Sequence, residues 1–194
     1  IGAMKCGTST LHDQLRRQPG TFMTTPKEPN FFSDDGQYAR GLDWYRSLFA
    51  QAASGAVRGE SSTHYTKLPT YPQTVERLFK AFPAVKLIYV MRHPVDRLVS
   101  HYIHEWTQRV IEVPIERAVD LHPELVAYSQ YGRQLEPFRK VFGDEVILPM
   151  LFEDLVSRPQ EHLERIGEFL GLRGPLRWEP EAPRNVSADR LRVS

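Results

Sequence analysis

The chain has 194 residues, of which 41% are hydrophobic and 25% are charged, and this composition fits a folded domain rather than a disordered or collagen-like chain. Lys and Arg total 25 against 24 Asp and Glu, and the formal net charge of +1 argues against nucleic acid as a partner. The single cysteine, Cys6, excludes an internal disulfide framework and a multi-cysteine zinc site. No apolar run is long enough for a membrane-spanning helix.

The length predicts one domain over residues 1–194, because a compact domain of this size buries enough surface to fold without disulfides or metals. The chain opens with Ile1-Gly2-Ala3, which reads as the end of a buried strand with no initiator methionine or signal peptide before it. We therefore expect a domain truncated at its N-terminus, so that a missing signal or anchor gives no information on location.

Strands and helices are expected to alternate along the first half of the chain. A tight loop at 4–8 separates the strand end at 1–3 from a helix over Ser9–Arg17, where Leu11 and Leu15 are four residues apart. The other elements expected here are strands at Thr21–Thr24 and Ala56–Glu60, a helix over Tyr38–Ala50, and a loop or single helical turn at Lys27–Phe32.

The clearest strand is Val85–Met91, a nearly continuous run of β-branched and aromatic residues that is typical of a strand buried on both faces. Around it we expect helices over Tyr71–Phe82, Pro94–Glu105, Gln130–Phe142 and Pro159–Leu170, a strand at Val146–Leu151, and no clear element over Leu172–Ser194. Strands separated by helices predict an α/β fold, in which helices flank a central, mainly parallel sheet.

The loop after the first strand has the composition of a phosphate-binding loop. Gly2 and Gly7 match both glycines of the nucleotide-triphosphatase pattern GxxxxGK[ST], and the amides of the following helix start would face an anion. Thr8 occupies the lysine position of that pattern, the only lysine within the loop is Lys5, and no acidic residue directly follows Met91 to hold magnesium. The loop is expected to bind phosphate without the set for ATP or GTP hydrolysis, and the alternative is a plain glycine turn.

A second anion site is expected where the clearest strand runs into the next helix. Arg92 follows the carboxyl end of this strand, where open α/β sheets bind ligands, and Ser100 lies two turns into the helix. A forked arginine contact and a serine hydroxyl could share one phosphate. The alternative is a surface ion pair between Arg92 and Asp96, with Ser100 merely packed.

Four motifs follow one another along the chain: GAMKCGTSTL at 2–11, KEPNFF at 27–32, GESSTHY at 59–65 and RHPVDRLVSHY at 92–102. Their order and spacing resemble the sulfotransferases that use 3′-phosphoadenosine 5′-phosphosulfate (PAPS), and most closely the carbohydrate branch that includes the heparan sulfate enzymes. The segments Phe152–Leu155 and Phe169–Leu172 also resemble landmarks of that family. The similarity covers nearly the whole chain and implies a three-layer fold similar to that of P-loop proteins.

The resemblance implies that the first loop holds the 5′-phosphosulfate and that Arg92 and Ser100 hold the 3′-phosphate. The residues of the implied 5′ site are Lys5, Cys6, Gly7, Thr8, Ser9 and Thr10. The product would be adenosine 3′,5′-bisphosphate (PAP), and the family needs no metal. Helix-start dipoles could lower the pKa of the Cys6 thiol, but the family tolerates several residue types there, which argues against a catalytic thiol.

Sulfuryl transfer requires a base for the acceptor proton and positive charge for the bridging oxygen. Lys5 is the natural cation, and Glu28 matches the general-base position of the heparan sulfate branch, the alternative being a structural carboxylate at a helix start. His64 is the rival base, and we place it on the acceptor side. His101 and His104 are three apart on one helix but have no evident carboxylate or cysteine partner, so we expect no metal site.

The sequence departs from the family's pattern at several positions, and the identity of the acceptor does not follow from the resemblance. Ser61 replaces the lysine that usually follows the glutamate of the third motif. The family's C-terminal loop over the 3′-phosphate, with its paired cysteines, is not visible, and Arg184, Arg190 and Arg192 are the residues that could substitute for it. The chain also stops before the family's last helices, so we expect truncation at the C-terminus as well.

The function expected from these observations is sulfuryl transfer from PAPS to a hydroxyl or amine of a sugar or small metabolite. The alternatives are a nucleotide-binding module without transferase activity and a phosphoryl-transferring kinase, which Thr8 in the lysine position disfavours. The basic residues are mostly arginine, which indicates a GC-rich bacterial source and, in that case, a cytoplasmic location.

Overall fold

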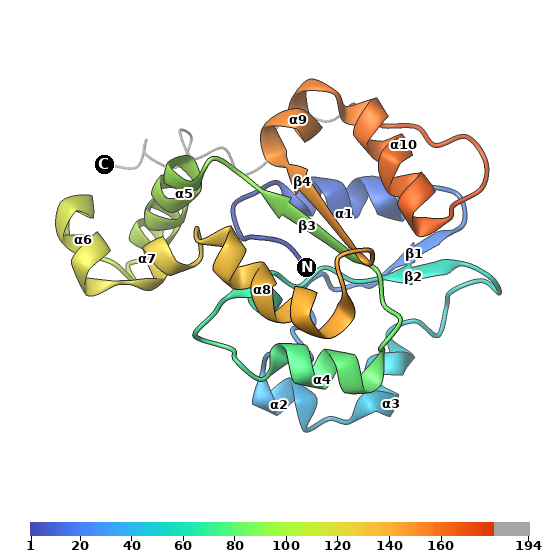
Figure 1. Cartoon of the computed structure of the whole chain (residues 1–194), viewed down its shortest axis with the longest axis horizontal. Helices are drawn as coiled ribbons and strands as arrows, with labels where there is room; N and C mark the ends of the chain where they lie inside the picture. Colours follow the sequence, from blue (N-terminus) through green and yellow to red (C-terminus); the bar gives the residue numbers. More distant parts are fainter. Residues whose placement is uncertain (181–194) are drawn as a thin grey trace.

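The computed structural model describes residues 1–180 and has the expected α/β fold (Figure 1). The strands in this range are β1 (Thr21–Met23), β2 (Val57–Gly59), β3 (Leu87–Met91) and β4 (Ile147–Leu151). The helices are α1 (Thr8–Arg16), α2 (Asp35–Tyr38), α3 (Leu42–Ser47), the 3₁₀ helix η1 (Thr63–Thr66), α4 (Thr74–Ala81), α5 (Pro94–Thr107), α6 (Ile115–Leu121), α7 (Glu124–Ala127), α8 (Tyr131–Phe142), α9 (Phe152–Ser157) and α10 (Pro159–Leu170). In Figure 1, α1, α9 and α10 lie on one side of the strands, and α4 and α8 lie on the other.

The strands pair in parallel, β1 with β2 and β3 with β4. The register of the second pair ends with Met91 opposite Leu151, so both strands stop at the same edge. Tyr89 and Val90 in β3 are at most 1% exposed, as expected for a strand covered on both faces. The amide of Ala3 donates to the carbonyl of Val90 (3.1 Å), so the N-terminal segment meets the middle of β3.

Local details differ from the prediction. Residues 1–3 do not form a regular strand, and the strands of residues 1–180 form two pairs rather than one continuous ladder. The helix expected over Tyr38–Ala50 is wrong: α2 and α3 flank Gly41, whose φ of 83° lies outside helical conformation. The short helices α6, α7 and α9 are missing from the prediction, because four to seven residues give too few turns for a clear apolar period.

An aromatic cluster at the centre of the core holds the loop at 27–32 against the body of the domain. Phe31 and Phe32 are 1% and 0% exposed, and their rings lie 4.9 and 5.1 Å from the ring of Tyr45. The Phe32 ring also contacts Tyr65 (5.7 Å) and Phe82 (6.1 Å) edge to face. Edge-to-face aromatic pairs stabilise the folded state in addition to the stabilisation that comes from burying their apolar surface. The loop that carries Glu28 is therefore fixed by the core.

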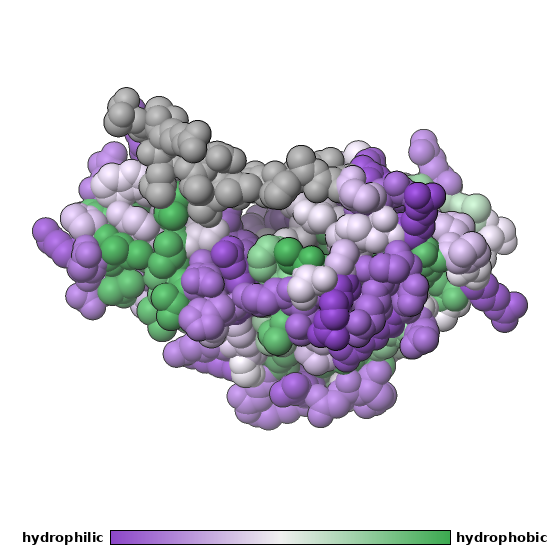
Figure 2. Space-filling view, turned by 90° about the horizontal axis from the view of Figure 1, so that it is seen from above, coloured by the Kyte–Doolittle hydropathy of each residue, from purple (hydrophilic) through white to green (hydrophobic). Residues whose placement is uncertain are grey.

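Helices α6 and α7 project from α5 as a small arm with its own core (Figure 1). The side chain of Gln134 on α8 ties the base of this arm to the chain after η1, because it bonds both the amide and the carbonyl of Leu68 (2.7 and 2.9 Å) and the carbonyl of Ala127 (2.9 Å). Apolar side chains gather at this end of the molecule (Figure 2), where Trp106 is 42% and Leu121 is 59% exposed. Among residues 1–180, no helix has both the length and the apolar content to cross a bilayer.

Replacement of Phe32 by alanine should lower the free energy of unfolding by about 3–5 kcal/mol, since the ring is fully buried and touches four other rings. Phe79→Ala is the matched control, because Phe79 is 41% exposed and its loss should cost about 1 kcal/mol or less. Urea unfolding followed by far-UV circular dichroism measures both. Equal losses for the two variants would contradict a core centred on this cluster.

Candidate active site

The loop between Ala3 and α1 is shaped to receive an anion. Lys5 and Gly7 both have left-handed backbone conformations, with φ of 69° and 74°, and Gly7 is the N-cap of α1. A Cβ on Gly7 would lie 2.7 Å from the ring of Phe152, so both the conformation and the space require glycine. The amides that begin α1, from Thr8 onward, have no partner within the helix and carry its positive dipole end. This combination favours a phosphate or sulfate.

The Cys6 side chain is buried rather than exposed at the surface of this loop. Its side chain is fully buried and its Sγ lies 3.6 Å from the carbonyl of Met4. Burial raises the pKa of the Cys6 thiol to about 12, so the thiol stays protonated at neutral pH. The expectation that helix-start dipoles lower this pKa is wrong, because desolvation dominates. Cys6 can contribute to a ligand only through its backbone.

Arg92 and Ser100 occupy the positions that the sequence predicts. Arg92 directly follows β3, and its guanidinium carbon lies 5.2 Å from the centre of the Phe152 ring. Its backbone is held by the hydroxyl of Tyr131, which accepts from the Arg92 amide (3.3 Å) and donates to the Arg92 carbonyl (2.7 Å). Ser100 is on α5 and is 5% exposed. The alternative ion pair with Asp96 does not form; Asp96 lies 4.0 Å from His93 instead.

Phe152 joins the two anion sites. It is the first residue of α9 and follows β4, so the parallel register places it beside Arg92. One ring therefore packs against Gly7 of the first loop and lies under the guanidinium of Arg92. The sequence analysis identified Phe152 only as a family landmark, because no local pattern shows which ring will separate two loops. The two loops are therefore adjacent, with the Phe152 ring between them.

Glu28 is held in a left-handed conformation with a φ of 61°. Its amide donates to the carbonyl of Ser61 (3.0 Å), and its carboxylate accepts from Lys27 Nζ (2.6 Å) and Thr63 Oγ1 (3.1 Å). Burial alone would raise the pKa of Glu28, but the Lys27 ammonium and the Thr63 hydroxyl outweigh it, and the pKa lies below its ordinary value of 4.5. The carboxylate is thus ionised at neutral pH, and 33% of the side chain is exposed to receive a proton.

A short relay of polar groups fixes the backbone after Glu28. The amide of Asn30, also left-handed with a φ of 51°, donates to Ser62 Oγ (3.0 Å), which in turn donates to Glu60 Oε2 (2.8 Å). Such strained non-glycine residues persist only where the surroundings hold them. The partners Thr63 and Ser62 were not singled out by sequence reasoning, since a hydroxyl that reaches a loop more than thirty residues away leaves no local pattern.

His64 lies on η1, in the segment that contacts the Glu28 loop. Its ring stacks on Tyr71 with the centroids 4.8 Å apart and an angle of 14° between the planes. Burial, followed by the charge of Lys67, lowers the pKa of His64 below 6.5, so the imidazole is neutral at neutral pH. Its Nδ1 is buried without a hydrogen-bond partner in the described part of the chain. His64 therefore retains an unused polar atom close to Glu28.

A cavity of about 110 Å³ lies between the start of α1 and the segment that follows β2. Thr8 lines it from the loop, and Ser61, Ser62 and Thr63 line it from the segment after β2. The remaining lining is mainly apolar and comes from α1 and the strands. Ser61 and Thr63, which bond to Glu28, and the start of α1 therefore border the same cavity.

The two histidines of α5 contact different side chains. His101 is buried between Arg97 (3.5 Å) and Glu105 (3.4 Å), so it does have a carboxylate neighbour, which the sequence analysis did not find. His104 instead contacts Gln108 (3.2 Å). Within residues 1–180, no group of three or more His, Cys, Asp or Glu side chains is arranged to hold a metal ion. Arg184, Arg190 and Arg192, the predicted substitutes for the family's C-terminal loop, lie outside the described residues.

The geometry defines an α/β fold with parallel strand pairs, in which a glycine loop before α1 lies next to the end of β3. The model of the sulfotransferase family matches residues 45–176, and the chain belongs to this family.

Curated proteins that are similar to this chain are also named as sulfotransferases. The chain is 31% identical over 183 residues to heparan sulfate glucosamine 3-O-sulfotransferase 3B1 of Mus musculus, covering 89% of this chain and 45% of the relative. It is 32% identical over 182 residues to heparan sulfate glucosamine 3-O-sulfotransferase 6 of Homo sapiens, covering 89% of this chain and 51% of the relative. The chain thus spans about half the length of the curated relatives that it matches.

Solved structures agree with the fold. A sulfotransferase from Alicyclobacillus acidocaldarius superposes with a TM-score of 0.78 at 27% identity, covering 93% of this chain and 84% of the other. The sulfotransferase domain from the curacin biosynthetic pathway superposes with a TM-score of 0.64 at 18% identity, covering 90% and 74%, and supports the fold alone.

The thiol of Cys6 should resist alkylation in the folded protein. A rise of the pKa from 9.0 to about 12 lowers the thiolate population about 10³-fold at pH 8, and burial blocks access further. Iodoacetamide labelling followed by mass spectrometry should show an unmodified native chain and complete modification in guanidinium chloride. Rapid labelling of the native chain would show that the loop exposes a reactive thiolate.

Proposed function

We propose that this chain transfers a sulfuryl group from PAPS to a hydroxyl or amine of a carbohydrate or small metabolite. The observation that carries the proposal is the contact of Phe152 with both Gly7 and Arg92, which brings two anion sites together at one edge of the strands. A donor with a 5′-phosphosulfate and a 3′-phosphate has charges at both ends that match this pair of sites. The family membership supports the same chemistry.

The residues present fit such a donor. Lys5 and Gly7 shape the loop, and the amides and hydroxyls of Thr8, Ser9 and Thr10 at the start of α1 would hold its 5′ end. Arg92 and Ser100 would hold its 3′-phosphate. The donor supplies the sulfuryl group and a phosphate leaving group. Lys5 would stabilise the charge that develops on the bridging oxygen, and the proposal requires no metal ion.

Glu28 is the base of this proposal. An ionised carboxylate has about four lone-pair sites, and Lys27 and Thr63 use only two, so it can still accept a proton from an acceptor hydroxyl. The same two contacts fix its direction. His64 is neutral and stacked on Tyr71, a placement that suits a residue on the acceptor side.

The acceptor is proposed to be a carbohydrate because the curated relatives are named for glucosamine in heparan sulfate. The site differs from that family at Ser61, which stands in place of the usual lysine. Ser61 Oγ lies 3.0 Å from Nδ1 of His12, and its carbonyl accepts from the amide of Glu28. This residue therefore supports the Glu28 loop and adds no positive charge for an anionic acceptor.

Glu28→Gln should lower kcat by about 10²–10⁴-fold and leave PAP binding nearly unchanged, because the amide keeps the shape of the side chain but cannot take the proton. The measurement is transfer of ³⁵S-labelled sulfate from PAPS to a panel of sugars and small alcohols or amines. In the wild type, kcat should fall on the acid side of pH 4.5, as protonation of Glu28 removes the base below its lowered pKa.

His64→Ala is the matched control for this experiment. It removes the other candidate base from the same region, and it should raise KM while retaining much of kcat. A variant pair with the opposite behaviour, in which Glu28→Gln turns over normally and His64→Ala is inactive, would reverse the assignment of the base.

Arg92→Ala should weaken PAP binding by about 10–150-fold, since a hydrogen bond to a charged group contributes about 1.5–3 kcal/mol. Binding of adenosine 5′-monophosphate, which lacks the 3′-phosphate, should change much less. Isothermal titration calorimetry with both nucleotides measures the difference. Arg133→Ala on the exposed side of α8 controls for the loss of a positive charge. Equal losses for the two nucleotides would remove Arg92 from the 3′ site.

A further inference from the structure

Arg97 is a buried cation for which the mechanism above has no use. Its side chain is 0% exposed, the lowest value for any charged residue of the core. Its guanidinium donates to Ser129 Oγ (2.5 Å) and to the carbonyl of Leu125 (2.5 Å), and Nη1 lies 3.5 Å from His101 Nδ1. All three partners are uncharged, because burial and the neighbouring Arg97 charge lower the pKa of His101 to about 3.

No salt bridge within residues 1–180 includes Arg97. A buried charge is costly unless a charge of opposite sign accompanies it, and hydroxyl and carbonyl dipoles compensate only in part. Neither carboxylate of this helix pairs with the guanidinium: Asp96 lies 4.0 Å from His93, and Glu105 contacts the far nitrogen of His101. Among residues 1–180, no carboxylate therefore compensates the positive charge of Arg97.

The two anion sites lie next to this charge. Arg97 is three residues before Ser100 on α5, which places both on one face of the helix. Ser129, its hydrogen-bond partner, also donates to the carbonyl of Pro94 (3.1 Å), two residues after Arg92. The charge of Arg97 also acts on Cys6 in the phosphate loop and on Tyr131, whose hydroxyl holds the backbone of Arg92.

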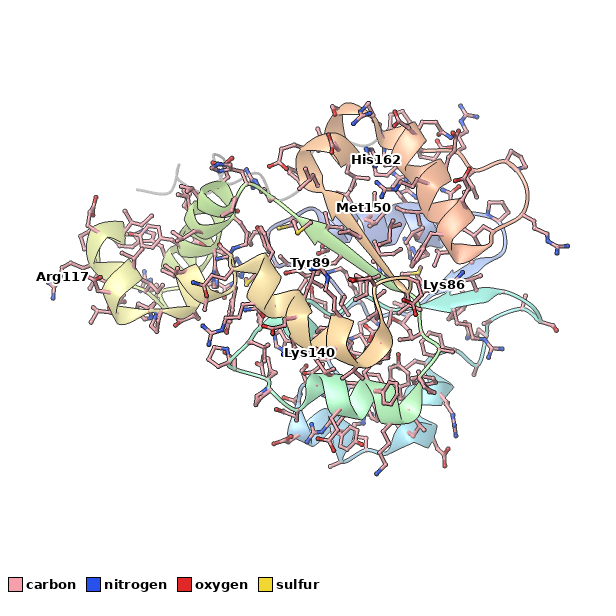
Figure 3. All side chains as sticks on the ribbon, in the orientation of Figure 1. Lys86, Tyr89, Arg117, Lys140, Met150 and His162 are labelled. Carbon is pink, nitrogen blue, oxygen red and sulfur yellow. The ribbon has the colours of Figure 1, made fainter. Side chains whose placement is uncertain are left out.

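The same charge reaches Tyr89, which Figure 3 labels at the centre of the molecule between β3 and α8. Arg97 thus lies in the interior beside both loops, and water cannot screen its field on that side. An interior charge in this position attracts an anion bound at either loop without touching it.

We infer that Arg97 is a positioning residue whose missing counter-ion is the anionic nucleotide, bound through its 3′- and 5′-phosphate groups at the two sites above. The inference rests on the proposed function for the location of the nucleotide, and adds a residue that acts through its field. It implies that a carboxylate built beside Arg97 would compete with the nucleotide for the same positive charge.

His101 offers a matched pair of variants for the test. His101→Glu places a carboxylate next to the guanidinium, whereas His101→Gln has a similar size and no charge. Isothermal titration calorimetry with PAP at low ionic strength should give a dissociation constant for the Glu variant about tenfold or more above that of the Gln variant. The dissociation constant of the Gln variant for PAP should stay within about threefold of that of the wild type. Equal affinities for the two variants would overturn the inference.

A second pair covers the case in which a carboxylate at 101 prevents folding. Arg97→Lys keeps the charge and loses the forked contacts, and Arg97→Gln loses both. The lysine variant should bind PAP about tenfold or more tightly than the glutamine variant; equal weakening would show that Arg97 has only a structural role. Binding of PAP to the wild type distinguishes failure of the proposed function from failure of the Arg97 inference. A wild-type chain that does not bind PAP contradicts the proposed function itself.

Discussion

The parallel pairing of β3 with β4 is the constraint on which the site depends. Both strands end at the same edge, so the residues that follow them, Arg92 and Phe152, must lie side by side. Phe152 then packs against Gly7, and only a residue without a Cβ leaves room for that contact. One register thus sets the separation of two anion sites that are more than eighty residues apart in the sequence. Because the net charge is only +1, the proposed binding of an anionic nucleotide depends on local groups such as Arg92 and the start of α1 rather than on a general positive field.

The Glu28 region depends on the core in a comparable way. The rings of Phe31 and Phe32 anchor the loop, and Ser61 and Ser62 hold the strained backbone of Glu28 and Asn30. The carboxylate is then oriented by one ammonium and one hydroxyl, which also keep it ionised. The proposed binding residues and the proposed base therefore come from separate elements whose positions are fixed by packing.

Much of this arrangement could be predicted from the sequence. The run at Val85–Met91 indicated a buried strand. Because open α/β sheets bind ligands at the carboxyl ends of their strands, Arg92 was predicted to bind an anion there. The spacing of Gly2 and Gly7 predicted the phosphate-binding loop before α1. The division at Gly41 was missed, because the apolar spacing of Tyr38–Ala50 continues across a residue whose conformation interrupts the helix.

Long-range electrostatics could not be predicted from local patterns. The Cys6 thiol lies at a helix start, yet burial raises its pKa, and only the packed structure shows how much solvent it loses. The hydroxyl of Thr63 reaches Glu28 across 35 positions, and the uncompensated charge of Arg97 depends on which carboxylates the fold leaves distant. Each depends on distances between elements that no motif encodes.

The central claim is that two anion sites hold a nucleotide with phosphates on its 3′ and 5′ positions and need no metal. The most direct measurement is the thermal midpoint of the wild-type chain in EDTA, titrated with PAP and, separately, with ADP in magnesium. At 100 times its dissociation constant, PAP should stabilise the fold by about 2.7 kcal/mol, which raises the midpoint by about 5–10 °C for a chain of this size. ADP with magnesium should have a much smaller effect. No shift with PAP, together with strong stabilisation by ADP and magnesium, would contradict the account and favour a phosphoryl-transfer site.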